Sequence, residues 1–221
     1  MPINTLFGRN RKNTGIMILE EECTLMQYTR EVQSQCEKFT CGEEDLDSFF
    51  QNDAFLYEEE MLGKTYCWVT NAKPHVIVCL VTIANDSIKS ALLPKNSRNR
   101  FNRIFNNEKR NLTYPATLIG RLGVNLKFQG QHIGQQLMNY LKDQNVASNN
   151  DNACRFLVVD AYNDQSTLAY YERNGFVYMH KTEEVERAAM RRFDEEGRLL
   201  YEIPEGERLL TRMMYFDLKK M

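Results

Sequence analysis

A glycine-containing loop between a strand-like run and a helical run is the first feature of this sequence that could do chemistry. The loop reads QGQHIGQ, from Gln129 to Gln135. The apolar run from Ala116 to Val124 precedes it, and the spacing of Ile133, Leu137 and Leu141 behind it has a helical period. The first turn of a helix carries unpaired backbone N–H groups and a partial positive charge. We therefore predict an anion site at this loop.

Two common nucleotide-binding motifs are missing. The sequence has neither a GxGxxG dinucleotide fingerprint nor a GxxxxGK[ST] phosphate loop. The three histidines lie far apart, and the six cysteines form no CxxC pair. We therefore expect no metal site and no disulfide framework, and we interpret the cysteines as buried thiols in a reducing compartment.

The elements that must position the loop alternate between β-like and helical patterns. An acidic stretch with Leu46, Phe50 and Ala54 at helical spacing precedes two β-rich runs separated by a turn that contains Pro74. A strand-like run at 16–19 opens the pattern. The other predicted strands are 64–70, 76–83, 116–124, 156–161, 175–179 and 208–218, and the predicted helices behind the loop cover 133–141, 166–173 and 183–194. This alternation predicts a mixed α/β fold.

Four short segments, in this order, resemble the GNAT acetyltransferases. They are RLGV at 121–124, QGQHIG at 129–134, VDAYN at 159–163 and YYERNGF at 170–176. More narrowly, FTCGEEDLDSFFQNDA at 39–54, followed by PATLIGRLGV, is similar to the branch that contains the acetyltransferase toxins of toxin–antitoxin pairs. The resemblance implies a GNAT fold, a mixed sheet of about six to seven strands flanked by helices and splayed at the acetyl-CoA site.

The resemblance also implies a reaction, the direct attack of a primary amine on the thioester of acetyl-CoA, with no metal. The loop would hold the pyrophosphate, and the end of the strand before it would stabilise the oxyanion and bind the pantetheine arm. Tyr171 matches the family's general acid, with a core tyrosine as the alternative, and Tyr170 is assigned to packing. The residues assigned to the cofactor are Leu122, Gly123, Val124, Gln129, Gly130, Gln131, His132, Ile133, Gly134, Gln135 and Asn163.

Three of these assignments need comment. The family's first motif glycine is His132 here. Histidine visits the left-handed region more readily than most residues and keeps its N–H, so the cradle can survive, although the imidazole can also crowd the cofactor. Gly123 lacks a side chain, which would let the cofactor approach closely. Asn163 resembles a cofactor contact, but an asparagine at a strand end is as commonly a helix or turn cap.

The general base is missing from the predicted central strand. Residues 116–124 contain no Asp or Glu, and Arg121 is their one ionisable side chain. An α-amine, with a reference pKa near 7.7 to 8.0, needs less help to deprotonate than a lysine near 10.4. The missing carboxylate therefore favours an α-amine acceptor, with a water chain or a carboxylate from 43–47 as other sources of a base.

The charges are distributed unevenly, although the net charge is only −2. Residues 41–60 hold eight acids and no base, whereas residues 89–110 hold seven bases and one acid. A basic segment can meet phosphates, and a solvated surface loop is the alternative. The acidic run could attract a cationic substrate, but a solvated helix face explains it equally. The candidate phosphate or tRNA contacts are Lys95, Arg98, Arg100, Arg103, Lys109 and Arg110.

The predicted function is an acetyl-CoA-dependent N-acetyltransferase, with the α-amine of aminoacyl-tRNA as the sharpest acceptor. The alternatives are a small-molecule or protein amine, and a cofactor-binding module without turnover. The toxin resemblance implies an antitoxin partner, and GNAT domains often pair as homodimers.

Length and composition set the remaining expectations. The 221 residues, 43% hydrophobic and 26% charged, are typical of a globular chain, and no apolar stretch is long enough to span a bilayer. We expect a cytoplasmic protein with a flexible basic tail at 1–15 and a single GNAT domain at 16–221. That domain would carry a basic insertion at about 89–111 and a charged helical insertion at about 182–207.

Overall fold

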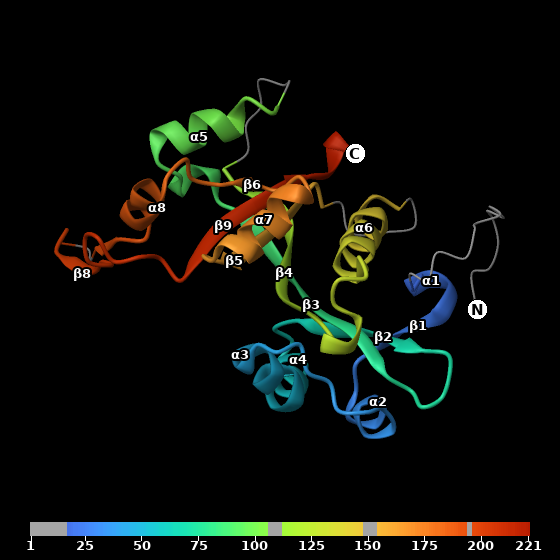
Figure 1. The fold of residues 1–221 in the computed structure, drawn as a ribbon. Coiled ribbons are helices and arrows are strands. Elements are labelled where there is room, and N and C mark those ends of the chain that lie inside the picture. The colour runs from blue at the N-terminus through green and yellow to red at the C-terminus, as the bar shows by residue number, and fades with distance from the viewer. Residues whose placement is uncertain (1–16, 106–111, 148–153, 194–195) are drawn as a thin grey trace.

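A mixed seven-stranded sheet organises the chain. The structure is a computed structural model that describes residues 17–105, 112–147, 154–193 and 196–221. The strand order is β1-β2-β3-β4-β5-β9-β6, and only the β4–β5 pair is parallel. This confirms the predicted fold class. The strands are β1 (Cys23–Gln27), β2 (Lys64–Thr70), β3 (Ile77–Ile88), β4 (Tyr114–Val124), β5 (Phe156–Tyr162), β6 (Val177–Tyr178) and β9 (Thr211–Asp217) (Figure 1).

Helices cover both faces of this sheet (Figure 1). One face, called the α6/α7 face here, packs against α1 (Leu19–Glu22), α6 (Ile133–Val146) and α7 (Gln165–Arg173). The opposite face, called the α3/α5 face, carries two separate cores. Around β2 and β3 it packs against α2 (Arg30–Gln35), α3 (Glu44–Ser48), the π-helix η1 (Phe49–Asp53) and α4 (Ala54–Glu59), and around β5 and β9 against α5 (Lys95–Asn102).

Short elements complete the described chain. The 3-10 turns are η2 (Ser90–Leu92), η3 (Leu126–Phe128) and η4 (Leu218–Lys220). Helix α8 (Glu183–Ala189) leads into a separate two-stranded sheet of β7 (Arg192–Phe193) and β8 (Leu199–Tyr201).

Strands β4 and β5 separate soon after they meet. They pair only from Ala116–Leu118 to Phe156–Val158, although both strands continue beyond. On its other side β4 stays paired with β3, but the register shifts within this pair. Arg121 opposes Thr82 and Ile119 opposes Ile83, so Gly120 has no partner and forms a bulge. Beyond Leu118 and Val158, backbone groups of both strands therefore face a gap between them rather than each other.

Three sequence expectations change in detail. The basic segment is not only loop: α5 forms within it because Phe101 is buried against Tyr114, Phe156 and Tyr215. The helix predicted at 183–194 ends at Ala189, and the strand predicted to end at 83 continues to Ile88. The predicted tail at 1–15 lies outside the described residues, as do Lys109 and Arg110.

All six cysteines are free thiols, and four of them are buried. Within the described ranges, no helix has the length and apolar character needed to cross a membrane.

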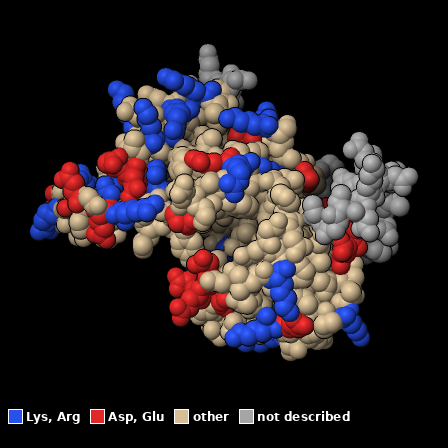
Figure 2. Space-filling model, in the orientation of Figure 1, with Lys and Arg blue, Asp and Glu red and all other residues tan. Residues whose placement is uncertain are grey.

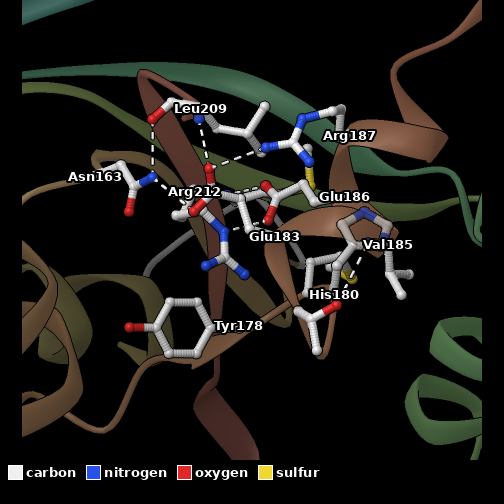
Figure 3. A network of polar contacts seen from close by, with 12 residues as sticks. Asn163, Tyr178, His180, Glu183, Val185, Glu186, Arg187, Leu209 and Arg212 are labelled. Carbon is white, nitrogen blue, oxygen red and sulfur yellow. Dashed lines mark hydrogen bonds and ion pairs between the residues drawn. The ribbon is translucent and has the colours of Figure 1, made fainter. Parts of the chain in front are cut away.

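A buried ion pair fastens α8 to β9 where β6 has ended (Figure 3). The Glu186 carboxylate accepts hydrogen bonds from Arg212 Nε and from the Met213 N–H, both at 2.6 Å. The two charged side chains are 1% and 10% exposed, and the Arg212 guanidinium lies over the Tyr178 ring, 4.8 Å from its centre. Glu186 therefore accepts the hydrogen bond of the Met213 N–H, which a carbonyl of β6 would accept if that strand were longer.

Removing this carboxylate should leave a buried, unpaired guanidinium. We expect Glu186→Ala to lower the free energy of unfolding by about 3 kcal/mol, the scale for breaking one side of a buried pair. Urea denaturation followed by circular dichroism measures this value. Glu59→Ala, at an exposed position on α4, should change it by less than about 0.5 kcal/mol. Equal midpoints for the two variants would contradict the structural role of Glu186.

Candidate active site

A cleft of about 1250 Å³ opens where β4 and β5 diverge. Its walls are the C-terminal parts of both strands, the loop before α6, one side of α7, the start of α3 and the segment 208–211. Figure 2 shows the surface hollowed beside the acidic cluster at α3. The cleft is large enough for a long, narrow ligand, and it brings together elements that are distant in the sequence.

The loop at the mouth of the cleft has the backbone that its sequence suggested. His132 adopts φ 61° and ψ 16°, the left-handed conformation, and is the N-cap of α6 without a side-chain cap hydrogen bond. Gly130 also has a positive φ, 77°. The first-turn N–H groups of α6, at Ile133, Gly134 and Gln135, have no partner within the helix and line the cleft. This geometry fits an anion such as a pyrophosphate.

Tyr170 fixes the loop to α7. Its phenol donates a hydrogen bond of 2.8 Å to the Gly134 carbonyl. A Cβ at Gly134 would lie only 3.1 Å from the Tyr170 ring, so the small residue allows this close packing. The assignment of Tyr170 to packing agrees with these contacts.

Tyr171 faces the cleft from the core of the α6/α7 face. It is 6% exposed, and its ring packs edge-on against Tyr170 and Phe176. Among the described residues its phenol makes no hydrogen bond, while the residue lines the cleft. Burial raises the pKa of Tyr171, because the phenolate would lose its hydration. Tyr171 therefore stays protonated near neutral pH and retains a proton to donate.

Three glutamines of the loop make side-chain hydrogen bonds that hold the loop in place. Gln129 Nε2 donates to the carbonyls of Cys41 and Val124, at 2.8 and 3.0 Å. Gln135 Nε2 donates to Asn174 Oδ1 at 2.8 Å and so joins α6 to the end of α7. Gln131 donates to the Lys127 carbonyl and is not among the residues that line the cleft.

The strand-end residues Leu122, Gly123 and Val124 all line the cleft. The reason for the glycine differs from the expected one. A Cβ at Gly123 would meet Phe50 at 3.1 Å and Phe39 at 3.2 Å, on the α3/α5 face. The missing side chain thus makes room for two core phenylalanines, while the backbone of Gly123 borders the cleft.

Asn163 is occupied by structural hydrogen bonds (Figure 3). Its Nδ2 donates to the Leu209 carbonyl at 2.8 Å and to Glu183 at 3.2 Å, and its N–H donates to the Leu210 carbonyl. Glu183 in turn accepts a hydrogen bond from the Leu209 N–H. These long-range contacts are not those of the helix or turn cap offered as the alternative, because the N-cap of α7 is Asp164. They hold Leu209 and Leu210 in the cleft wall, which no sequence motif indicated.

The basic residues of α5 lie outside the cleft lining. Lys95 and Arg98 belong to α5, and Arg103 is its C-cap. Figure 2 shows Lys and Arg side chains gathered in the region of this helix. Arg100 makes structural hydrogen bonds, because its guanidinium donates to the carbonyls of Tyr178 and Met179.

Carboxylates line the cleft, although the predicted central strand contains none. Glu43, Glu44 and Asp45 line it at the start of α3. Asp47 is committed to Thr40 and to the Cys41 N–H; the hydrogen bonds outweigh its burial and lower the pKa of its carboxyl. Asp160 of β5 also lines the cleft. Asp160 was not predicted, because a base was expected on the strand that became β4, from residues 43–47 or through a water chain.

Comparisons with known proteins agree with this geometry. Residues 101–178 match the family model described as "Acetyltransferase (GNAT) domain". No curated protein sequence matches the chain. Three solved structures each cover 90% of the chain: a Tyr-to-Phe variant of KacT, AtaT complexed with acetyl-methionyl-tRNAfMet, and AtaTR bound with AcCoA. Their TM-scores are 0.57, 0.56 and 0.56, their identities 17%, 18% and 18%, and 97%, 96% and 96% of those chains are covered.

The diverging strands and the helix start between them lie within or beside the segment 101–178, which is similar to a GNAT acetyltransferase domain. Over 90% of the chain the fold is similar to those of KacT and of the toxin AtaT. The resemblance stated from the sequence is thereby confirmed. The roles of the individual site residues remain predictions.

Packing at Gly123 can be tested separately from chemistry. We expect Gly123→Val to lower the free energy of unfolding by about 1–3 kcal/mol, because the added methyl groups overpack Phe39 and Phe50. A Cβ at Gly120 would meet only the Thr82 carbonyl oxygen, at 3.7 Å. Gly120→Val should therefore cost less in the same thermal or urea unfolding experiment. The reverse order would show that the space beside Gly123 is not the constraint.

Proposed function

We propose that the protein is an N-acetyltransferase that moves an acetyl group from acetyl-CoA to the α-amine of an aminoacyl-tRNA. One observation carries the proposal: the uncapped start of α6, the unpaired ends of β4 and β5 and the phenol of Tyr171 all face a single cleft. Each of these features meets one need of thioester aminolysis. The parts are therefore assembled for one reaction.

The residues present fit acetyl-CoA, which supplies the activated acetyl group when bound. First-turn N–H groups at Ile133, Gly134 and Gln135 would hold its pyrophosphate. Backbone groups of Leu122 to Val124 would bind the pantetheine arm and stabilise the oxyanion. Tyr171 would give its phenolic proton to the departing sulfur, a role supported by its protonated state and unpartnered hydroxyl.

His132 supports turnover rather than opposing it. Its left-handed conformation gives α6 the same kind of start that a glycine would give, and its side chain makes no cap that would occupy the N–H groups. This favours an enzyme over a binding module without turnover. Acetyl-CoA binding without CoA release from any amine would reverse that preference.

The choice of tRNA rests on charge and on the solved relatives. AtaT was solved with acetyl-methionyl-tRNAfMet, and α5 presents a basic surface that can meet phosphates. A small cationic amine is the second candidate, because Glu43, Glu44 and Asp45 line the cleft. A free amine would need no basic surface outside the cleft, so α5 favours the tRNA.

The solved relatives also indicate partners. AtaT is known bound to the C-terminus of the antitoxin AtaR, and a KacTA–DNA complex has been solved. By analogy we propose an antitoxin that neutralises this protein. A homodimer and a cytoplasmic location remain predictions from the family resemblance.

The two adjacent tyrosines give a matched test of the chemistry. We expect Tyr171→Phe to lower kcat with charged tRNA about 10²- to 10⁴-fold, the range for losing a general acid. Tyr170→Phe removes a hydrogen bond to Gly134 and should cost about 1 kcal/mol of stability with much less effect on kcat. Initial rates of CoA release measure both. Unchanged kcat in Tyr171→Phe would remove this residue from the mechanism.

The basic surface predicts how charged tRNA is recognised. Lys95→Gln combined with Arg103→Gln should raise KM for aminoacyl-tRNA severalfold and flatten its dependence on salt, because fewer phosphate counterions are released. The affinity for acetyl-CoA should not change. Lys38→Gln, at an exposed position between α2 and α3, is the matched control. Equal KM values in both variants, or turnover only with free amines, would exclude this mode of tRNA binding.

A further inference from the structure

Asp160 faces the gap between β4 and β5 from the side opposite to Tyr171. Successive residues of a strand point to opposite faces of the sheet. Val159 and Ala161 pack in the same core as Tyr171, so Asp160 lies on the α3/α5 face together with Val158. The residue also lines the cleft. A phenol and a carboxylate therefore border the cleft from two different faces.

The carboxylate of Asp160 is uncommitted. Among the described residues it takes part in no hydrogen bond and no ion pair. It is open to the cleft, yet the cleft walls displace much of the surrounding water, and this desolvation raises the pKa of its carboxyl. The free carboxylate is therefore a stronger base than one on an open surface.

One neighbouring charge adds to the effect of burial on Asp160. Asp86 of β3 also raises its pKa, and Asp86 shares the α3/α5 face because its β4 partner, Ala116, packs there. Glu186 of α8 interacts electrostatically with Asp160, but it is paired with Arg212. The nearest cation on β4, Arg121, is directed to the Phe49 ring.

We propose that Asp160 is the general base that receives a proton from the acceptor ammonium. This inference rests on the proposed function and supplies the base that β4 lacks. The ammonium gives one proton to the Asp160 carboxylate, and the neutral amine attacks the thioester carbon. The C–N bond forms, the C–S bond breaks, Tyr171 protonates the thiolate, and the second amine proton returns to Tyr171. The products are the acetylated amine, CoA thiol and a protonated Asp160 that releases its proton to water.

The α3/α5 face carries cations outside the cleft and a carboxylate inside it, so an acceptor with both kinds of charge can match it. Helix α5 packs on the α3/α5 face through Phe101, and its exposed bases surround this contact. An acceptor that enters from this face meets cations outside the cleft and a carboxylate inside it. An aminoacyl-tRNA has the matching order of charges, with phosphates behind an α-ammonium end.

The test is a pH profile of kcat/KM for charged tRNA with wild type and Asp160→Asn, from about pH 5.5 to 8.5. Near pH 7 we expect Asp160→Asn to lose about 10²- to 10⁴-fold. The loss should shrink as the pH rises toward the α-amine pKa of about 7.7 to 8.0, because the acceptor then deprotonates without help. Acetyl-CoA affinity, measured by calorimetry, should stay the same in the variant.

Asp86→Asn is the matched control for charge. Removing that negative charge should lower the pKa of Asp160 and shift the acidic limb of the profile to lower pH while activity is kept. A wild-type profile in Asp160→Asn, or a loss that is equal at every pH and accompanied by weaker acetyl-CoA binding, would overturn the role of Asp160 alone. No acetylation of charged tRNA by wild type would overturn the proposed function, and this inference with it.

Discussion

The separation of β4 from β5 is the constraint on which the rest of the site depends. A parallel pair normally satisfies the backbone along its whole length, but here pairing stops at Leu118 and Val158. The bulge at Gly120 bends β4 while it remains paired with β3. The gap therefore offers main-chain groups to a ligand without loosening the rest of the sheet.

The connection between the two strands also places the start of a helix at the gap. Parallel neighbours need a crossover, and α6 supplies it. Its first turn consequently lies at the mouth of the gap, and His132 starts the helix without capping it. Gln129 and Tyr170 then fix the loop from two sides. Precise placement of free N–H groups thus arises from packing around the loop rather than from the loop alone.

The C-terminal part of the chain completes the wall through buried polar contacts. Glu183 and Asn163 hold Leu209 and Leu210, and Glu186 pairs with Arg212 beside the short β6 (Figure 3). A buried network of this kind is stabilising only while every member is satisfied. The charged segment after Lys181 therefore belongs to the architecture of the cleft and is more than a solvated helix.

Although it did not predict β1 or α5, the sequence by itself indicated most strands of the sheet, the helix that opens at the glycine loop and the family resemblance. These depend on local signals: hydrophobic period, turn residues and motif spacing, all read along the chain. It also anticipated a left-handed residue at His132, because backbone conformation there is a local property. The packing role of Tyr170 followed from its place beside Tyr171 in an apolar helix end.

Only the tertiary structure decided which side chains meet across the gap. The space at Gly123 is taken by Phe39 and Phe50, which lie 84 and 73 residues earlier in the chain. Asp160 became a candidate base only when the strands were placed. The sheet face on which a strand residue lies, and whether it lines a cleft, depend on the neighbouring strands. Asn163 turned out to be committed to Leu209 for the same reason. Long-range contacts of this kind leave no period or spacing in a single sequence.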